Sequence, residues 1–215
     1  MLSEAAQRDG AMLGQVVYER REGDFYPTPP ENVDCLAHFV DLSGRVIWEP
    51  ACGEGHISKR LLQLTGTDAV TGAQVYSTDL HHRGYGRGGI DFLRATVTPR
   101  RVNTIITNPP FDDLAEAFIR RALALMEPVD GLVAMFLRNE YDCASTKRDD
   151  LFEGHPAYAT KIVVTKRPRW IEGSKGSPRH NYSWFVWDFA DRGAPATIRY
   201  IHPRDAAPIC PATIN

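Results

Sequence analysis

The sequence contains no run of apolar residues long enough to cross a membrane. A membrane-spanning helix needs roughly 20 consecutive apolar residues, whereas the apolar residues of this 215-residue chain occur in short groups. The first residues, MLSEAAQRDG, also lack the basic start and the long apolar centre of a secretory signal peptide. These absences argue against a helical membrane protein and predict a protein of the cytoplasm with no membrane partner.

Cysteine is scarce, with four residues at positions 35, 52, 143 and 210. No two of them form a C-x-x-C pair, and their spacing does not match that of a zinc site. The pattern therefore predicts reduced thiols rather than disulfides, and no bound metal.

An excess of charge of either sign is also missing, because the formal net charge is -2 at pH 7. This balance excludes an acidic tail and a generally basic nucleic-acid binder. The length suits one domain with a sizeable core.

Short β-branched or apolar runs alternate along the chain with amphipathic stretches. The runs predict strands, and the stretches predict helices at 31–42, 56–64, 114–126 and 145–152, with the strands at 45–49, 73–77, 102–107, 131–137, 161–165, 183–189 and 197–201. Such alternation implies an α/β fold, with a mostly parallel seven-stranded sheet and helices on both faces. No helix-length spacer separates the last strands, so we expect a C-terminal antiparallel hairpin on the sheet edge.

The most informative segment is Asn108-Pro109-Pro110-Phe111, which directly follows the strand predicted at 102–107. Proline fixes its own φ, lacks an N–H and holds the preceding residue extended. The segment would present two rigid acceptors, the Asn108 side-chain oxygen and the Pro109 carbonyl, beside a flat ring. Such a corner suits a planar amino group, whose two hydrogens meet the acceptors while the ring covers its π-face. A proline turn that merely closes a strand is the alternative interpretation.

A glycine-containing loop with the sequence EPACGEG, residues 49–55, joins a predicted strand to a predicted helix. It lacks the G-x-G-x-x-G spacing and the Lys-Ser/Thr ending of phosphate loops. Its acidic residues, Glu49 and Glu54, favour a positively charged ligand such as an amine or a sulfonium. Asp79 ends the next predicted strand, where a carboxylate can accept hydrogen bonds from ribose hydroxyls; a solvated turn residue is the alternative. Together these segments predict a nucleoside-like pocket at the strand ends.

The order of EPACGEG, Ser77-Thr78-Asp79, Asp91-Phe92-Leu93 and NPPF resembles the class I S-adenosylmethionine-dependent methyltransferases that act on the exocyclic amine of adenine. FYPTPP at 25–30 resembles the cofactor-contacting segment of the adenine-N6 DNA methyltransferases in which that segment comes first, and residues 166–187 resemble small phage- and prophage-type members. The resemblance covers roughly residues 24–190. It implies the Rossmann-like class I methyltransferase fold.

The same resemblance implies the organisation and setting of the protein. An N-terminal extension at 1–23 and a tail at 203–215 would flank one catalytic domain at 24–202. The enzyme would be a monomer or homodimer in the cytoplasm of a bacterial or phage-infected cell.

A role for each motif residue also follows from the resemblance. Asn108 and Pro109 would grip the target amine, and Pro110 and Phe111 would complete the catalytic group, the Phe111 ring stacking on the target base. The cofactor site would comprise Tyr26 and Thr28 at the methionyl end, Glu49, Ala51, Gly53 and Gly55 along the amino acid and ribose, Asp79 at the ribose, Asp91 and Phe92 at the adenine, and in addition Cys52, Leu80 and Asn108.

The implied reaction is a direct in-line attack of the N6 amine of adenine in DNA on the methyl group of S-adenosylmethionine, which leaves S-adenosylhomocysteine. Two acceptors on the amine would raise the electron density on its nitrogen, and alignment of two reactants can lower a barrier by about 7–11 kcal/mol. No covalent intermediate is needed, so we expect Cys52 to be a packing residue. A duplexed base would first have to be flipped out.

A basic and aromatic segment between residues 161 and 182 is the candidate contact with nucleic acid. Cations interleaved with aromatic rings suit a phosphate backbone and an unstacked base; the alternative is a solvated strand end with core or lid aromatics. The expected contacts are Lys166, Arg167, Arg169, Trp170, Lys175, Arg179 and Tyr182. No separate target-recognition domain is expected, so recognition would fall to the loops at 81–90, 138–150 and 166–182.

The motifs leave the substrate open. An RNA base-amine methyltransferase would share the amine grip, and so would a protein glutamine N-methyltransferase, although the latter needs no phosphate contacts. A non-catalytic nucleic-acid-binding subunit is a fourth interpretation.

Overall fold

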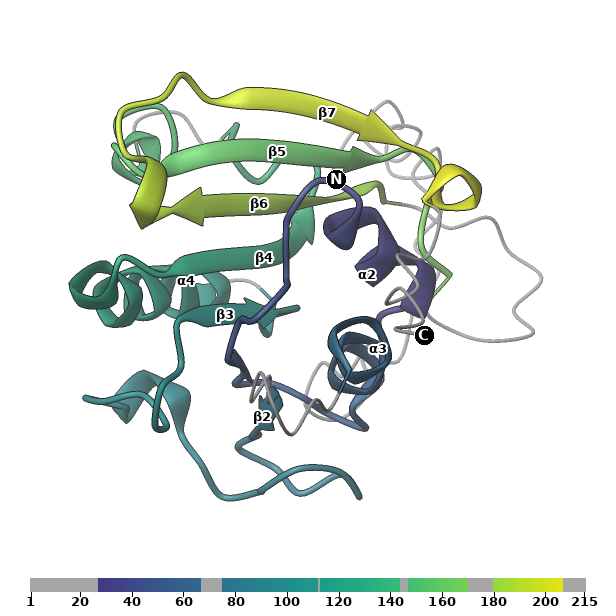
Figure 1. The fold of residues 1–215 in the computed structure, drawn as a ribbon, viewed down its shortest axis with the longest axis vertical. Helices are drawn as coiled ribbons and strands as arrows, with labels where there is room; N and C mark the ends of the chain where they lie inside the picture. The colour runs from purple at the N-terminus through teal and green to yellow at the C-terminus, as the bar shows by residue number, and fades with distance from the viewer. Residues whose placement is uncertain (1–26, 67–74, 112, 144–146, 170–179, 207–215) are drawn as a thin grey trace, which may run out of the picture.

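The computed structural model describes residues 27–66, 75–111, 113–143, 147–169 and 180–206. Its strands form one seven-stranded sheet in the order β2-β1-β3-β4-β6-β5-β7 (Figure 1). Paired neighbours are parallel, except that β6 runs antiparallel to both β4 and β5. The strands are β1 Ile47–Glu49, β2 Val75–Ser77, β3 Thr104–Thr107, β4 Leu132–Arg138, β5 Tyr158–Val164, β6 Tyr182–Asp188 and β7 Thr197–Ile201. The expectation of a mostly parallel seven-stranded sheet is confirmed.

The sheet separates two hydrophobic clusters, and the helices cover it on both sides. One cluster contains apolar side chains of α2 (Pro30–Ala37) and α3 (His56–Thr65), and the other contains those of α4 (Asp113–Met126). Successive side chains of a strand point to opposite faces, so β4 supplies both clusters: Leu132, Ala134 and Phe136 enter the first, and Val133, Met135 and Leu137 the second. This double burial explains why β4 is an unbroken apolar run.

Three short strands determine where the candidate motifs meet. β1 pairs in parallel with β2 on one side and with β3 on the other, and Glu49 lies opposite Ser77. Because the strands are parallel, their carboxyl ends lie at the same edge of the sheet. The loops that follow β1, β2 and β3 carry EPACGEG, Asp79 and NPPF respectively, so this edge collects all three motifs.

The C-terminal strands differ in one respect from the expected arrangement. β5 and β6 form the antiparallel pair, but β6 lies inside the sheet between β4 and β5, and β7 forms the edge parallel to β5. The apolar side chains of β6 explain this order. Trp184 is buried on one face of the sheet, and Phe185 and Trp187 are buried on the other, so the strand needs cover on both faces. β7 is exposed along its first four residues, as an edge strand can be.

Two expected helices are shorter in the structure. The helix expected at 31–42 ends at Ala37, and the chain then turns, with the Asp41 carboxylate accepting a hydrogen bond from the Ser43 N–H. In place of an α-helix at 145–152, the described residues 147–152 contain the 3₁₀ turn Asp149–Leu151. An ion pair between Asp150 and Arg120 holds this turn against α4. Local hydrogen bonds of aspartate compete with the helix in the first segment.

Trp184 offers a test of the layer between β6 and α2. Its side chain is fully buried, and its indole N–H donates to the Asn32 carbonyl at 2.7 Å. Replacement by Phe should lower the free energy of unfolding by about 1–3 kcal/mol, because the buried carbonyl loses its donor and the core loses volume. Urea unfolding followed by circular dichroism measures the change. Tyr200→Phe, on the exposed edge strand, is the matched control and should shift stability by less than about 0.5 kcal/mol; equal losses in the two variants would contradict this packing.

Candidate active site at the carboxyl ends of the strands

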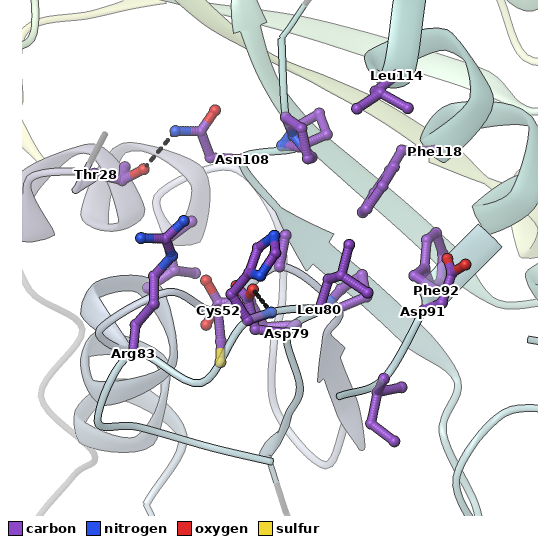
Figure 2. Close-up of a pocket in the computed structure, with 18 of the residues that line it drawn as sticks. Thr28, Cys52, Asp79, Leu80, Arg83, Asp91, Phe92, Asn108, Leu114 and Phe118 are labelled. Atoms are coloured by element: carbon purple, nitrogen blue, oxygen red, sulfur yellow. Dashed lines mark hydrogen bonds between the residues drawn. The ribbon is translucent and has the colours of Figure 1, made fainter. Parts of the chain in front are cut away.

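A cavity of about 520 Å³ opens at the carboxyl ends of β1, β2 and β3 (Figure 2). Its volume lies within the range of small-molecule sites. The wall brings together most of the residues that the sequence singled out. These are Thr28, Glu49, Ala51, Cys52, Asp79, Leu80, Asp91, Phe92, Asn108, Pro109, Pro110 and Phe111.

Asp79 holds two loops at the centre of the cavity. Its Oδ2 accepts a hydrogen bond from the Gly53 N–H, and its Oδ1 accepts one from the His81 N–H, both at 2.8 Å. The side chain is 9% exposed, so its position is fixed by these bonds rather than by solvent. One carboxylate therefore fixes both the glycine-containing loop and the start of the following loop.

The two glycines of the loop support the wall and are not among the described residues that line the cavity. Gly55 has a φ of +80°, and a Cβ there would lie 2.2 Å from the Tyr85 ring. The ring thus occupies the space that a side chain would need. We conclude that Gly55 permits a close packing of the 80–90 loop on the glycine loop, which the sequence alone did not indicate.

Glu49 ends β1 and is buried, with 2% of its surface exposed. Its Oε2 accepts from the Ser58 N–H at 2.8 Å and from the Ser58 hydroxyl. Burial raises the pKa of Glu49 to about 8, against the lowering effect of the Ser58 hydrogen bonds. A cation in the cavity would favour the ionised form. Glu54, by contrast, is exposed on the loop and does not line the cavity.

Asn108 is oriented by a contact between segments far apart in the sequence. Its amide nitrogen donates to the Thr28 hydroxyl at 3.1 Å, and Thr28 is 3% exposed. Since the nitrogen is directed to Thr28, the amide oxygen points the other way (Figure 2). The hydrogen bond to Thr28 thereby fixes the orientation of the Asn108 amide and leaves its oxygen directed away from Thr28.

The opposite end of the cavity is aromatic. Phe92 and Phe118 have ring centroids 4.9 Å apart, and Phe92 also meets the edge of Trp48. Phe118 lies on α4, and the sequence did not identify it as a site residue. The one available signal was its place in the apolar pattern of a helix that begins shortly after the NPPF segment. Asp91 lines this end while its carboxylate accepts from the Leu93 N–H at 3.0 Å.

The basic segment begins at the same edge of the sheet. Val164, which ends β5, lies opposite Tyr182, and Tyr182 lies opposite Arg138 at the carboxyl end of β4. Lys166, Arg167 and Arg169 are exposed; the first pairs with Glu31 at 3.4 Å, and the second donates to Asn181 at 3.0 Å. The expected contacts Trp170, Lys175 and Arg179, like Tyr26 of the cofactor set, lie outside the described residues.

Two members of the basic segment lie in the interior. Tyr182 is 2% exposed and its ring stacks on Phe136 with centroids 5.3 Å apart, so this position favours packing over contact with nucleic acid. Lys161 is also buried, with its ammonium 2.8 Å from the Asp142 carboxylate. Tyr182 is the first residue of β6 and Lys161 lies within β5, so both residues belong to the sheet.

Two further features of the site concern the Cys52 thiol and the side chains that could bind a metal ion. Burial raises the pKa of the Cys52 thiol to about 12, so it stays protonated and suits the packing role expected for it. Among the described residues no group of three or more His, Cys, Asp or Glu side chains is placed to hold a metal ion.

The donor set of the cavity fits S-adenosylmethionine. An aromatic end at Phe92 and Phe118 suits the adenine, the central Asp79 suits ribose hydroxyls, and the carboxyl group of Glu49 in the wall suits a positive charge. The aromatic rings and the carboxyl groups of the wall thus match the aromatic, hydroxyl and cationic groups of this cofactor. When bound, the cofactor would supply an electrophilic methyl group.

No family model and no curated protein matches the sequence. Solved structures are similar in fold. A candidate class I S-adenosylmethionine-dependent methyltransferase from Listeria monocytogenes has a TM-score of 0.58 and 13% identity, over 92% of this chain and 72% of that one. A candidate RNA methyltransferase from Pyrococcus horikoshii has a TM-score of 0.53 and 15% identity, over 86% and 98%.

A methyltransferase subunit of a type I restriction-modification system from Streptococcus thermophilus has a TM-score of 0.52 and 16% identity. It is matched over 78% of this chain but only 45% of its own length. These likenesses, with the topology and the position of the cavity, show that the chain adopts the Rossmann-like fold of the class I S-adenosylmethionine-dependent methyltransferases.

Proposed function

We propose that this protein transfers a methyl group from S-adenosylmethionine to the N6 amine of adenine in DNA. The observation that supports the proposal is that Asn108–Phe111 and the carboxyl groups of Glu49 and Asp79 line one cavity, with the Asn108 amide oriented by Thr28. One site thus combines an amine grip with a cation-compatible pocket.

In this proposal each residue has a limited task. The Asn108 Oδ1 and the Pro109 carbonyl accept hydrogen bonds from the two hydrogens of the target amine. Phe111 stacks on the base, which contributes about 1–3 kcal/mol and offsets part of the cost of extracting it. Glu49 and Asp79 hold the cofactor, so the protein contributes position and hydrogen bonding and forms no covalent intermediate.

Exposed cations at the same edge are the proposed contacts with the phosphate backbone. Lys166, Arg167 and Arg169 lead out of β5 beside the end of β4, and a backbone that crosses this edge would pass the mouth of the cavity. A charge-dependent contact of this kind gives affinity without sequence selectivity.

RNA is the second candidate substrate. The amine grip does not distinguish the two polymers, and the structures of similar fold include both a candidate RNA methyltransferase and a restriction-modification subunit. The deciding experiment incubates the protein with isotopically labelled S-adenosylmethionine and DNA, RNA or protein, and identifies the modified group by mass spectrometry. N6-methyladenine in DNA supports the proposal. A methylated RNA base or glutamine amide, or no methylation despite cofactor binding, would replace it with the corresponding alternative.

Asn108→Ala tests the amine grip directly. The variant should bind S-adenosylhomocysteine with nearly unchanged affinity, while kcat falls by about 10²–10³, because an acceptor that acts on the reacting group is lost. Calorimetry and a methylation assay provide the two measurements. Unchanged turnover would show that Asn108 does not hold the amine.

Thr28→Val removes the hydroxyl that orients Asn108 and keeps the shape of the side chain. Loss of one hydrogen bond should lower kcat by about 10-fold. Thr28→Ser restores the hydroxyl and is the matched control, so it should recover most of the rate. A rate loss that is equal in both variants would point to packing rather than to the hydrogen bond with Asn108.

The pKa of Glu49, about 8 in the cavity without cofactor, predicts that cofactor binding is linked to a proton. Below pH 8 the carboxyl group is mostly protonated, and a bound cation favours its ionised form, so binding should release up to about one proton and tighten as pH rises toward 8. Above pH 8 the dependence should level off. Calorimetry in buffers of different ionisation enthalpy measures the proton, and Glu49→Gln should abolish this contribution.

A further inference from the structure

One end of the cavity, formed by Thr28, Asn108 and Arg83, still lacks an assigned ligand group. Figure 2 shows Phe92 and Phe118 at one end, Asp79 and Leu80 in the middle, and Thr28, Asn108 and Arg83 at the other end. If the adenine occupies the aromatic end and the ribose meets Asp79, the methionyl group reaches the end at Thr28. That group carries an ammonium and a carboxylate as well as the adjacent sulfonium.

The charges of the wall suit the cations of this ligand but not its carboxylate. Three carboxyl groups, those of Glu49, Asp79 and Asp91, line the cavity. Arg83 is the one arginine or lysine among the described lining residues. The imidazoles of His56 and His81 also line the cavity, and burial lowers the pKa of His56. A carboxylate that enters this cavity therefore needs Arg83 or backbone donors to balance the acidic wall.

We propose that Arg83 binds the carboxylate of the methionyl group of the cofactor, an inference that rests on the proposed function. The guanidinium extends from its loop toward the end occupied by Thr28 and Asn108 (Figure 2). A planar guanidinium matches a carboxylate with two parallel N–H donors. Arg83 is then a cofactor-binding residue that the sequence motifs do not include.

The loop that carries Arg83 is fixed at its base. The His81 N–H donates to the Asp79 carboxylate at 2.8 Å, and the Ile90 N–H donates to the Asp79 carbonyl at 3.0 Å. Both ends of the loop are thus tied to Asp79. A loop whose ends are fixed loses less conformational entropy when one of its residues binds a ligand, which favours a specific anion contact over a diffuse one.

A phosphate of the nucleic acid is the other anion that an arginine could meet at this site. Arg83 is half-buried and lines the cavity, whereas Arg87 of the same loop is exposed and does not line it. A phosphate backbone passes over exposed side chains, and a small carboxylate enters the cavity. The burial of Arg83 therefore favours the cofactor carboxylate.

The test compares S-adenosylmethionine with decarboxylated S-adenosylmethionine, which lacks only the carboxylate, by calorimetry without nucleic acid. Arg83→Ala should weaken binding of S-adenosylmethionine by about 10–100-fold, because a charge-assisted pair is lost. It should change binding of the decarboxylated compound by less than about threefold, so the selectivity of the wild type for the carboxylate should largely disappear. Arg83→Gln should behave in the same way, and Arg87→Ala is the matched control and should leave both affinities unchanged.

The outcomes separate this proposal from the proposed function. If the wild type binds neither compound, the proposed function fails and this inference fails with it. If the wild type binds S-adenosylmethionine but Arg83→Ala weakens both compounds equally, Arg83 supports the loop and the carboxylate contact is wrong. If both affinities are unchanged and binding of nucleic acid weakens, Arg83 contacts a phosphate instead.

Discussion

The parallel register of β1, β2 and β3 is the constraint on which the site depends. These strands have only three or four residues each, yet their pairing places Glu49 opposite Ser77 and Trp48 opposite Ile105. A shift by one residue would turn each strand's side chains to the other face of the sheet. Trp48 would then leave the cluster under α4, and Glu49 would leave Ser58. The burial of Ile47 and Trp48 in β1 therefore also sets the position of the Glu49 carboxyl group.

Burial of carboxyl groups at this edge requires donors, and the chain supplies them from its own loops. Asp79 receives the N–H groups of Gly53 and His81, and Glu49 receives the N–H and hydroxyl of Ser58. An isolated buried carboxylate is costly, whereas one that accepts two or three hydrogen bonds is tolerated. Glu49 is 2% exposed, and this burial raises its pKa to about 8 in spite of the hydrogen bonds from Ser58. A cationic ligand in the cavity would favour the ionised form of Glu49.

Periodicity and motif order predicted the parts of the structure that depend on local sequence. The strand at 197–201 matches β7, and the helix at 56–64 matches α3 within one residue, because a glycine borders that helix at each end. The position of β6 inside the sheet could not be predicted, since strand order depends on contacts distant in sequence. Phe118 was missed for the same reason: only the packing of α4 against Phe92 shows that it faces a cavity and not merely the core. The motif also gave no sign that a side chain at position 55 would meet the Tyr85 ring, because Tyr85 lies 30 residues further along the chain.

The buried position of Tyr182 connects the C-terminal strands to the Asn108–Phe111 corner. Its ring stacks on Phe136 of β4 and lies 6.5 Å from the ring of Phe111. Phe111 is partly buried and packs against the same cluster. A ring that is to stack on a planar ligand binds it better if the plane of the ring is fixed beforehand, because ordering the ring on binding would cost side-chain entropy.

β6 runs antiparallel to β4, so its first residue lies at the carboxyl edge of the sheet, behind the NPPF corner. A parallel strand in that position would place its last residue there instead, and the chain leaving β5 would have to cross the sheet. The antiparallel insertion of β6 therefore has two consequences. It places the Tyr182 ring near the Phe111 ring, and it makes the connection between β5 and β6 begin and end at the carboxyl edge of the sheet.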